Sequence, residues 1–134
     1  MKLLVTGTAG FIGFHLARTL LERGHDVLGF DNINDYYDPL HKHARLDVLR
    51  SFAQFKFIRG DLTDNDALTA AWKACDPEVV VHLAAQAGVR YSIENPQAYI
   101  QSNIVGFQNI AELVRYRKPR NFLYASSSSV YGGN

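Results

Sequence analysis

The chain has little cysteine, little net charge and no long apolar run. Its one cysteine, Cys75, cannot form an internal disulfide, which is typical of a protein from a reducing compartment. Fourteen basic and thirteen acidic side chains leave a formal net charge of +1, so we expect neither nucleic acid nor a membrane as a partner. The apolar start, residues 1–5, is too short for a signal peptide or a membrane span. We therefore expect a cytoplasmic protein.

Strand-like and helix-like segments alternate along the chain. Hydrophobic residues make up 47% of the 134 residues, which is enough for a packed core. The run Val79–Val81 is apolar on both faces, as in a parallel strand that helices cover on each side. The expected strands are Leu3–Thr6, Asp26–Phe30, Phe55–Ile58, Val79–Leu83 and Phe122–Ala125.

Helix signals fill the segments between these strands. Thr63 with Asp66 resembles a capping box, and Asn95 followed by Pro96 is typical of an N-cap and the first position of a helix. A stripe of apolar residues ends before a glycine in the first such segment. The patterns predict helices over residues 11–23, from 63 to about 73 and from 95 to about 116, with a short helix after a loop at residues 36–39.

This alternation predicts an α/β fold with a Rossmann-like, doubly wound, mostly parallel sheet. The expected strand order is 3-2-1-4-5, and residues 1–134 are expected to form one nucleotide-binding domain. Because doubly wound sheets usually continue past a fifth strand, we also expect the fold to be truncated before its remaining strands and a substrate domain.

A glycine-rich segment, residues 6–13, connects the first expected strand to the first helix. Gly7 suits a tight turn, Gly10 the close approach of a pyrophosphate, and Gly13 the close packing of the helix on the sheet. The phosphates would then meet free N–H groups at the start of the helix. A plain turn is the alternative, but the position between a strand and a helix favours a nucleotide site.

Asp31 ends the second expected strand. A carboxylate there can accept hydrogen bonds from the hydroxyls of an adenosine ribose, and it repels a 2′-phosphate. The residues that follow, Asn32 and Ile33, include no arginine that could bind such a phosphate. We therefore expect NAD rather than NADP, with an aspartate that merely caps a turn as the alternative.

Together, these motifs resemble the extended short-chain dehydrogenase/reductase family, and within it the NAD-dependent nucleotide-sugar epimerases and dehydratases. The resemblance rests on residues 6–13, 31, 60–62, 82–86 and 126–132, which follow the order and spacing of the family. Residues 31–37 and 85–92 look most like UDP-glucuronate 4-epimerases. The resemblance implies a UDP-linked nucleotide sugar as substrate and NAD as the carrier of hydride from C4 and back, through a 4-keto sugar.

The resemblance also implies roles for single residues around the cofactor. Asp61 and Leu62 would flank the adenine, and Leu83–Ala85 would line the middle of the cofactor, unless the alanines only pack a helix on the sheet. Asn103 is polar on the expected buried face of the long helix, where it would hold the cofactor region or, alternatively, tie down a loop backbone. The expected cofactor residues are Gly7, Gly10, Phe11, Ile12, Gly13, Asp31, Asn32, Asp61, Leu62, Leu83, Ala84, Ala85, Gln86 and Asn103.

For catalysis, the resemblance singles out Ser127, whose hydroxyl would bond to the 4-oxygen of the sugar and help its proton leave. Ser128 and Ser129 stand where 4,6-dehydratases carry an acid and a base, which speaks against dehydration. These two serines and Arg90 are candidate substrate contacts, with a merely polar loop and a surface ion pair as the alternatives.

Three histidines receive structural interpretations. His41 and His43 have no third ligand nearby, so no metal site is expected. His82 falls inside an expected strand and is predicted to be a buried, hydrogen-bonded histidine.

The general base of the family, a tyrosine followed four residues later by a lysine, has no match here. None of the seven tyrosines has a lysine at that position, so we expect the base to lie beyond residue 134 and this chain alone to be inactive. A 4-epimerase is favoured; a dehydratase or another sugar epimerase, and a non-catalytic NAD-binding module, remain open. An unpaired fifth strand would favour a homodimer or other self-association.

Overall fold

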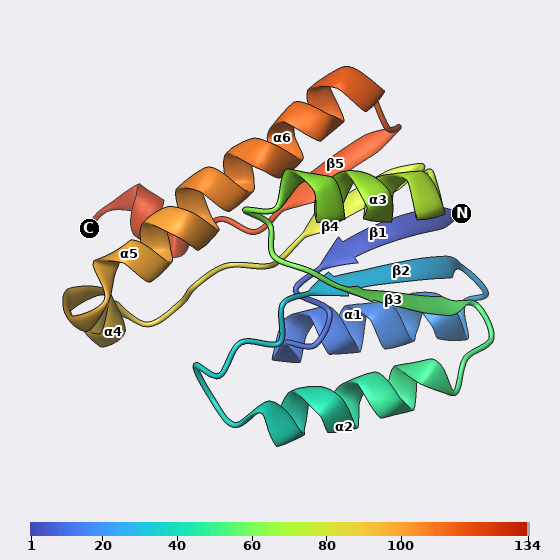
Figure 1. Cartoon of the computed structure of the whole chain (residues 1–134), viewed down its shortest axis with the longest axis horizontal. Coiled ribbons are helices and arrows are strands. Elements are labelled where there is room, and N and C mark those ends of the chain that lie inside the picture. Colours follow the sequence, from blue (N-terminus) through green and yellow to red (C-terminus); the bar gives the residue numbers. More distant parts are fainter. Residues whose placement is uncertain (134) are drawn as a thin grey trace.

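The computed structural model describes residues 1–133, which form a five-stranded parallel sheet with helices on both faces (Figure 1). The strand order is β3-β2-β1-β4-β5 and every neighbouring pair is parallel, which confirms the predicted topology. In chain order the elements are β1 (Lys2–Thr6), α1 (Phe11–Glu22), β2 (Asp26–Asp31), α2 (Pro39–Arg50), β3 (Phe55–Arg59), α3 (Asn65–Cys75), β4 (Val79–His82), α4 (Val89–Glu94), α5 (Pro96–Tyr99), the π-helix η1 (Ile100–Val105), α6 (Gly106–Arg117), β5 (Asn121–Tyr124) and the 3₁₀ turn η2 (Ser128–Tyr131).

The core consists of two apolar layers, one on each face of the sheet. In β1, Leu3 and Val5 belong to the layer that also holds Ala17 of α1 and Leu46 of α2, whereas Leu4 belongs to the other layer. The second layer holds Trp72 of α3 and Ile110 of α6. Helices α1 and α2 thus cover one face and α3 and α6 the other (Figure 1). Successive strand residues point to opposite faces, so a central strand must be apolar on both.

The start of α3 differs from the predicted capping box. Asp64, not Thr63, is the N-cap, and its carboxylate accepts hydrogen bonds from the backbone N–H groups of Asp66 and Ala67, both at 3.0 Å. The Thr63 hydroxyl instead donates to Asp61 at 2.8 Å. The prediction that Thr63 caps the helix was wrong because a neighbouring carboxylate binds its hydroxyl.

The expected long helix is present but interrupted. Asn95 caps it as predicted, accepting a hydrogen bond from the N–H of Ala98 at 3.3 Å, and Pro96 follows. Between α5 and α6, however, the chain forms the π-helix η1, which the apolar pattern did not predict. The patterns also did not predict α4, and α2 is twelve residues long rather than short.

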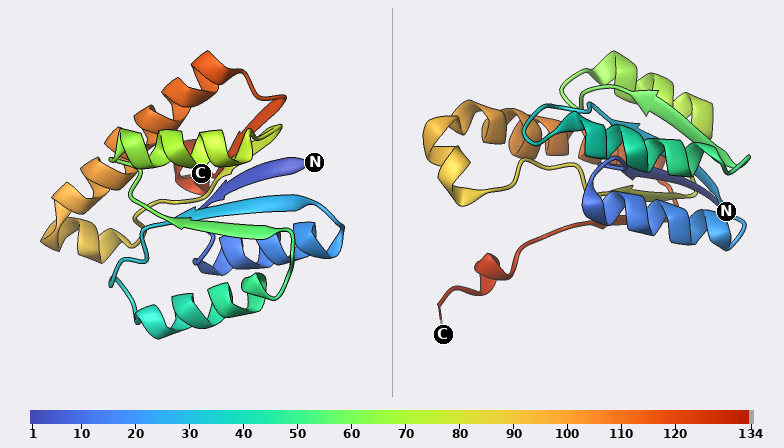
Figure 2. Two further views of the ribbon diagram at one scale, coloured as in Figure 1. Left: turned by 45° about the vertical axis from the view of Figure 1, so that its right-hand side comes forward. Right: turned by 90° about the horizontal axis from the view of Figure 1, so that it is seen from below.

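Strand β5 lies at the edge of the sheet, as predicted. Leu123 and Tyr124 on this strand are each more than half exposed. After β5 the chain runs away from the body of the molecule (Figure 2). Exposed apolar side chains at an open sheet edge are the feature from which self-association was predicted, and the association itself remains a prediction.

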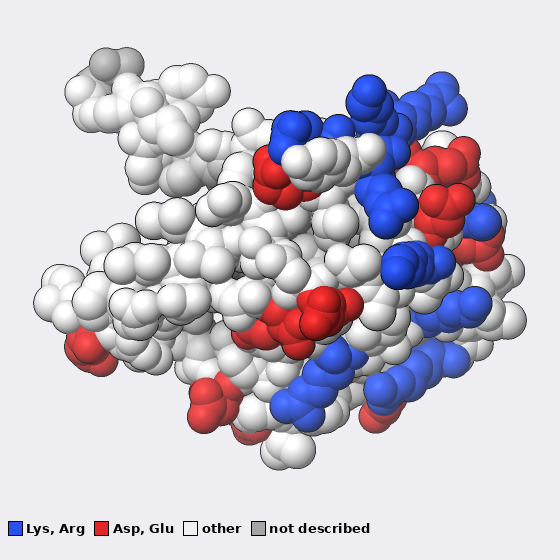
Figure 3. Space-filling model, turned by 45° about the horizontal axis from the view of Figure 1, so that its top comes forward, with Lys and Arg blue, Asp and Glu red and all other residues white. Residues whose placement is uncertain are grey.

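Charged side chains are spread unevenly over the surface. Residues 95–111 contain no Asp, Glu, Lys or Arg, and Figure 3 shows a broad uncharged region at one end, with mixed charges at the other.

In the part of the chain that the structure describes, no helix combines the length and apolar character needed to cross a membrane.

Candidate functional site

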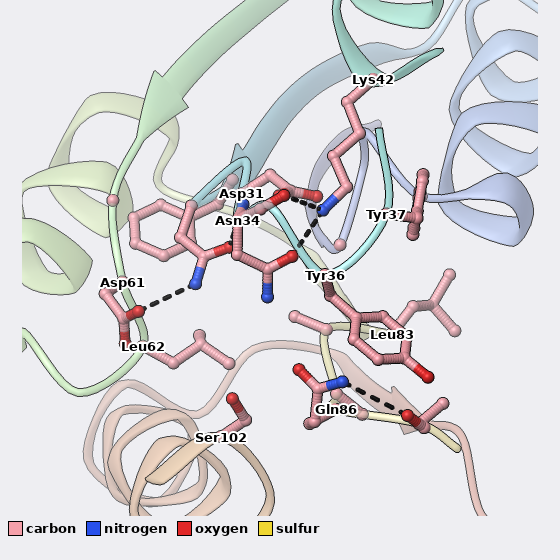
Figure 4. A pocket seen from close by; sticks show the side chains of 18 residues that line it. Asp31, Asn34, Tyr36, Tyr37, Lys42, Asp61, Leu62, Leu83, Gln86 and Ser102 are labelled. Carbon is pink, nitrogen blue, oxygen red and sulfur yellow. Dashed lines mark hydrogen bonds between the residues drawn. The ribbon is translucent and has the colours of Figure 1, made fainter. Parts of the chain in front are cut away.

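A cleft opens at the carboxyl ends of the strands, close to β1 (Figure 4). Strands β2 and β3 lie on one side of β1, and β4 and β5 lie on the other, so the strand order reverses at β1. Open parallel sheets bind ligands at this reversal of strand order. The cleft is lined by Gly7, Gly10, Phe30, Asp31, Asn32, Asn34, Tyr36, Tyr37, Lys42, Gly60, Asp61, Leu62, Leu83, Ala84, Ala85, Gln86, Ala87 and Ser102.

Most residues predicted to bind a cofactor line this cleft, although they come from four different strand ends. Those that line it are Gly7, Gly10, Asp31, Asn32, Asp61, Leu62, Leu83, Ala84, Ala85 and Gln86. Phe11, Ile12 and Gly13 lie in the first turn of α1. Asn103 does not line the cleft, but it accepts a hydrogen bond from the backbone N–H of Gln86, which does. The structure thus brings ten predicted residues to one cavity; Gly13 and Asn103 contact its walls from outside, and the side chains of Phe11 and Ile12 are largely exposed at the start of α1.

In the glycine loop, backbone atoms of different segments lie very close to one another. Gly7 has φ +72°, and a Cβ there would lie 2.8 Å from the backbone nitrogen of Ala84. A Cβ on Gly13 would overlap the carbonyl oxygen of Gly7. Only glycine therefore lets α1 begin so close to the loop and to the end of β4.

The start of α1 is suited to an anion. Its N-cap is Gly10, no side chain caps it, and its first turn contains no acidic residue. By contrast, the carboxylates of Asp38 and Asp64 cap α2 and α3. Uncapped N–H groups at the positive end of a helix bind phosphate well, so this end of the cleft fits the diphosphate of a dinucleotide.

Asp31 connects the glycine loop to the end of β2. Its two carboxylate oxygens accept hydrogen bonds from the N–H groups of Ala9, at 3.0 Å, and Ile33, at 2.8 Å. The residue is almost fully buried and faces the cleft. A carboxylate has about four acceptor positions, so these two bonds leave room for ribose hydroxyls.

Asp61, which follows β3, is held in the cleft wall beside Asn32. Asn32 donates to one of its oxygens at 2.9 Å, and the backbone and hydroxyl of Thr63 donate to the other at 2.9 and 2.8 Å. Burial alone would raise the pKa of Asp61, but these hydrogen bonds together lower it. The residue therefore stays an ionised acceptor, able to bind an amino group such as that of adenine.

Lys42 was not predicted from the sequence, yet it reaches the cleft beside Asp31 (Figure 4). Its ammonium donates to the backbone oxygen of Asn34 at 2.8 Å and to the side-chain oxygen of the same residue at 2.6 Å. The signal that could have revealed it is the buried stripe of α2, on which Lys42 stands in line with Leu46 and Leu49. A lysine on a buried helix face is rare unless it is paired.

Three tyrosines that the motifs did not single out connect the loops on either side of the cleft. The ring of Tyr36 lies 4.9 Å from that of Tyr91, which lies 6.2 Å from that of Tyr99. The Tyr99 hydroxyl donates to the carbonyl oxygen of Ala87 at 2.8 Å. The loop after β2 is thereby held against the loop after β4.

Asn103 reaches the cleft through Gln86. Its side-chain oxygen accepts from the Gln86 N–H at 2.8 Å, and its amide nitrogen donates to the Gln86 carbonyl at 2.9 Å. This geometry is the loop-tying alternative considered for Asn103. Since Gln86 lines the cleft, Asn103 is a positioning residue, and the π-helix η1 carries it, as π-helical turns often do at functional sites.

Thr6 and His82 form a buried pair under the cleft floor, as predicted for His82. The Thr6 hydroxyl lies 2.8 Å from Nδ1 of His82, and it accepts from the N–H groups of Leu83 and Ala84, both at 3.2 Å. Because two N–H groups already donate to this oxygen, the network is satisfied when Thr6 donates its own proton to a neutral His82. Burial lowers the pKa of His82 to about 4.

This lowered pKa makes a testable prediction about stability. A histidine that is neutral when folded stabilises the fold above its unfolded pKa of 6.5, and that contribution is lost as the pH falls towards 4. We expect the loss to be on the order of 3 kcal/mol in the free energy of unfolding. Urea unfolding of wild type and His82→Asn at pH 7 and pH 4.5 measures it, since asparagine keeps an acceptor but does not titrate. Equal losses in both proteins would contradict the assignment.

The predicted catalytic and substrate residues lie outside the cleft lining. Ser127 Oγ accepts from the N–H of Ser129 at 3.1 Å and so caps η2, beyond the carboxyl end of β5. Ser127, Ser128, Ser129 and Arg90 are all exposed. Within residues 1–133, no three His, Cys, Asp or Glu side chains gather in a way that could hold a metal ion.

A comparison with known families identifies the family of the chain. Residues 3–134 match the model of the NAD dependent epimerase/dehydratase family. The chain belongs to this family. Its match extends over both the cleft residues and the segment after β5.

Individual members of the family are similar over the whole chain. Protein CapI of Staphylococcus aureus is 56% identical over 134 residues, which are 100% of this chain and 40% of that protein. A probable UDP-glucuronate 4-epimerase of Rhizobium meliloti is 49% identical over 100% of this chain and 39% of its own length. The crystal structure of a Bacillus cereus UDP-glucuronic acid 4-epimerase in complex with UDP-glucuronic acid and NAD is 38% identical, with a TM-score of 0.91, over 100% of this chain and 42% of that one. The chain thus spans about 40% of the length of these relatives.

Proposed function

We propose that this chain is the NAD-binding part of an NAD-dependent nucleotide-sugar 4-epimerase whose substrate is UDP-glucuronate. The observation that carries the proposal is the cleft in which the glycine loop, the uncapped start of α1 and the Asp31 carboxylate meet. Similarity to UDP-glucuronate 4-epimerases over the whole chain supports the choice of substrate. Because those relatives are much longer, the activity belongs to a longer protein that contains this chain.

Each part of the cleft would hold a different part of NAD. Asp61 and Leu62 would receive the adenine, Asp31 and Asn32 its ribose, and the glycine loop with the first turn of α1 the diphosphate. The strand end Leu83–Gln86 would line the remainder. When bound, NAD supplies a hydride acceptor and donor for C4 of the sugar.

Ser127, after β5, and Arg90, in α4, would contact the substrate. The Ser127 hydroxyl would bond to the 4-oxygen and assist the loss of its proton, while Arg90 would bind a phosphate or the sugar carboxylate. Hydroxyls at Ser128 and Ser129 favour epimerisation over elimination of water, which needs a stronger acid and base.

A second candidate is a non-catalytic NAD-binding module. One observation favours it: no tyrosine of the chain is followed four residues later by a lysine. A homodimer and a cytoplasmic location also remain predictions from the sequence.

Binding and turnover, measured separately, test the proposal. Calorimetry with this chain is expected to show NAD binding, while incubation with NAD and UDP-glucuronate is expected to give no UDP-galacturonate on chromatography. The longer protein is expected to form UDP-galacturonate. Failure of the chain to bind NAD would refute the cofactor assignment, and NAD binding without turnover by the longer protein would favour the non-catalytic module.

A further inference from the structure

A buried cation accompanies Asp31 in the cleft wall. Lys42 is only 5% exposed, although lysine is almost never so buried without a partner. Asn34 accepts two of the three ammonium protons, through its backbone oxygen and its side-chain oxygen. The ammonium can thus make one further bond, on a wall that also carries Asp31 and Asn32 (Figure 4).

The charge of Lys42 is coupled to that of Asp31. Burial lowers the pKa of Lys42, the Asp31 carboxylate raises it, Arg45 lowers it and Asp35 raises it. The net effect is a lowered pKa for Lys42, and the Asp31 carboxylate is the largest influence that favours its charged form. Removing the Asp31 carboxylate would remove the main negative charge near the ammonium, while the cation itself stays in the cleft wall.

This position is where the ribose of an adenosine would lie. In dinucleotide sites, an acid at the end of the second strand reads the ribose 2′-hydroxyl, and a nearby cation accommodates a 2′-phosphate. The sequence has no cation directly after Asp31, but α2 returns Lys42 to the acid. The cleft wall therefore carries both an acid and a cation that could interact with the 2′ position of the ribose.

We propose that Lys42 and Asp31 together determine cofactor specificity at the adenosine 2′ position, and that Lys42 is a latent 2′-phosphate site that Asp31 suppresses. This inference rests on the proposed NAD-binding function and goes beyond it. A 2′-phosphate carries a charge of about −2, so it is repelled by the carboxylate and attracted by the ammonium. Without the carboxylate, the ammonium can donate to the phosphate directly.

The neighbouring cation Arg45 provides a matched control. Its guanidinium donates to the carbonyl oxygen of Ala9 at 3.1 Å and to the Tyr37 hydroxyl at 3.0 Å, and it is not among the residues that line the cleft. Arg45→Met removes a positive charge from the same helix face. It is expected to change the affinities for NAD and NADP by similar factors and so to leave their ratio unchanged.

Calorimetric titration with NAD, NADP and adenosine 2′-monophosphate tests the proposal. Wild type is expected to prefer NAD, and Asp31→Ser to raise the NADP-to-NAD affinity ratio by about 10- to 100-fold. Lys42→Met in the Asp31→Ser background is expected to abolish most of that gain, whereas Arg45→Met in the same background is not. Adenosine 2′-monophosphate should follow the pattern of NADP, because it carries the phosphate without the nicotinamide half.

The outcomes separate this inference from the proposed function. The inference alone is overturned if wild type binds NAD but Asp31→Ser does not raise the NADP-to-NAD affinity ratio. It is also overturned if that rise persists when Lys42 is replaced as well. A wild type that binds neither cofactor overturns both. Asp31 also accepts hydrogen bonds from the N–H groups of Ala9 and Ile33, so its replacement could unfold the chain, and thermal unfolding is measured for each variant. If Asp31→Ser is unfolded, Asp31→Asn, which keeps one acceptor oxygen, is used in its place. The same two results, no rise in the affinity ratio or a rise that persists without Lys42, would then overturn the inference for Asp31→Asn.

Discussion

Replacing Ser127 by alanine is expected to lower the turnover of the longer enzyme by about 10²- to 10⁴-fold, the range typical of lost acid–base assistance. By the proposed function, its hydroxyl meets the 4-oxygen of the sugar as the proton leaves. In the structure the same oxygen accepts from the N–H of Ser129 and caps η2, so alanine also removes a local bond. Steady-state kinetics and NAD titration distinguish the two effects: kcat is expected to fall while the Kd for NAD stays unchanged.

Two further variants control for the local bond. Ser127→Thr keeps the hydroxyl and is expected to retain most of the turnover. Ser129→Ala leaves Ser127 and its own backbone N–H in place and is expected to be mild. If Ser129→Ala is the damaging change, the catalytic hydroxyl has been assigned to the wrong serine.

The second large effect is expected from Gly13→Ala, which should weaken NAD binding by at least about 100-fold. A Cβ there would overlap the carbonyl oxygen of Gly7 and lie 2.7 Å from its carbonyl carbon and 3.0 Å from Cα of Thr8. These neighbours are backbone atoms, so α1 and the glycine loop must move apart. Calorimetry measures the loss of binding, and thermal unfolding should show a destabilisation of about 1–3 kcal/mol.

Gly24→Ala separates lost stability from lost binding. Gly24 has φ +76° just after α1, at the end away from the cleft, and a Cβ there would meet nothing within 4 Å. Alanine at this backbone angle costs about 1–2 kcal/mol, so stability should fall while NAD affinity stays unchanged. Unchanged NAD affinity in Gly13→Ala would show that the loop tolerates a wider opening and would contradict the prediction.

The main features of the cleft were predictable because they follow from local backbone requirements. A glycine is needed wherever backbone approaches backbone, as at Gly7 and Gly13, and these requirements are visible as a spacing in the sequence. Asp31 was predicted by its place at a strand end, and the structure puts it at the cleft. The cofactor roles of these residues remain predictions until binding is measured.

The features that the sequence did not decide share a different cause, since each depends on a neighbour distant in sequence or on competition between adjacent groups. Thr63 fails as a cap because Asp61 binds its hydroxyl. Asn103 acts on Gln86, and the π-helix that carries Asn103 leaves no mark in an apolar pattern. Hydrogen bonds of this kind are specified by geometry that residue types alone do not encode.

Apolar runs such as Val79–Val81 and the glycine spacing were enough to predict the strands, their parallel order and the place of the cleft, because burial on two faces and close backbone contact restrict which residues are allowed. The surroundings of Asp31 required the folded chain. Lys42 lies on another element, and only the packing of α2 brings its charge into the cleft. Electrostatic energy depends on distance in space and on burial, not on separation along the chain, and for this reason the balance between the two charges could be recognised only after folding.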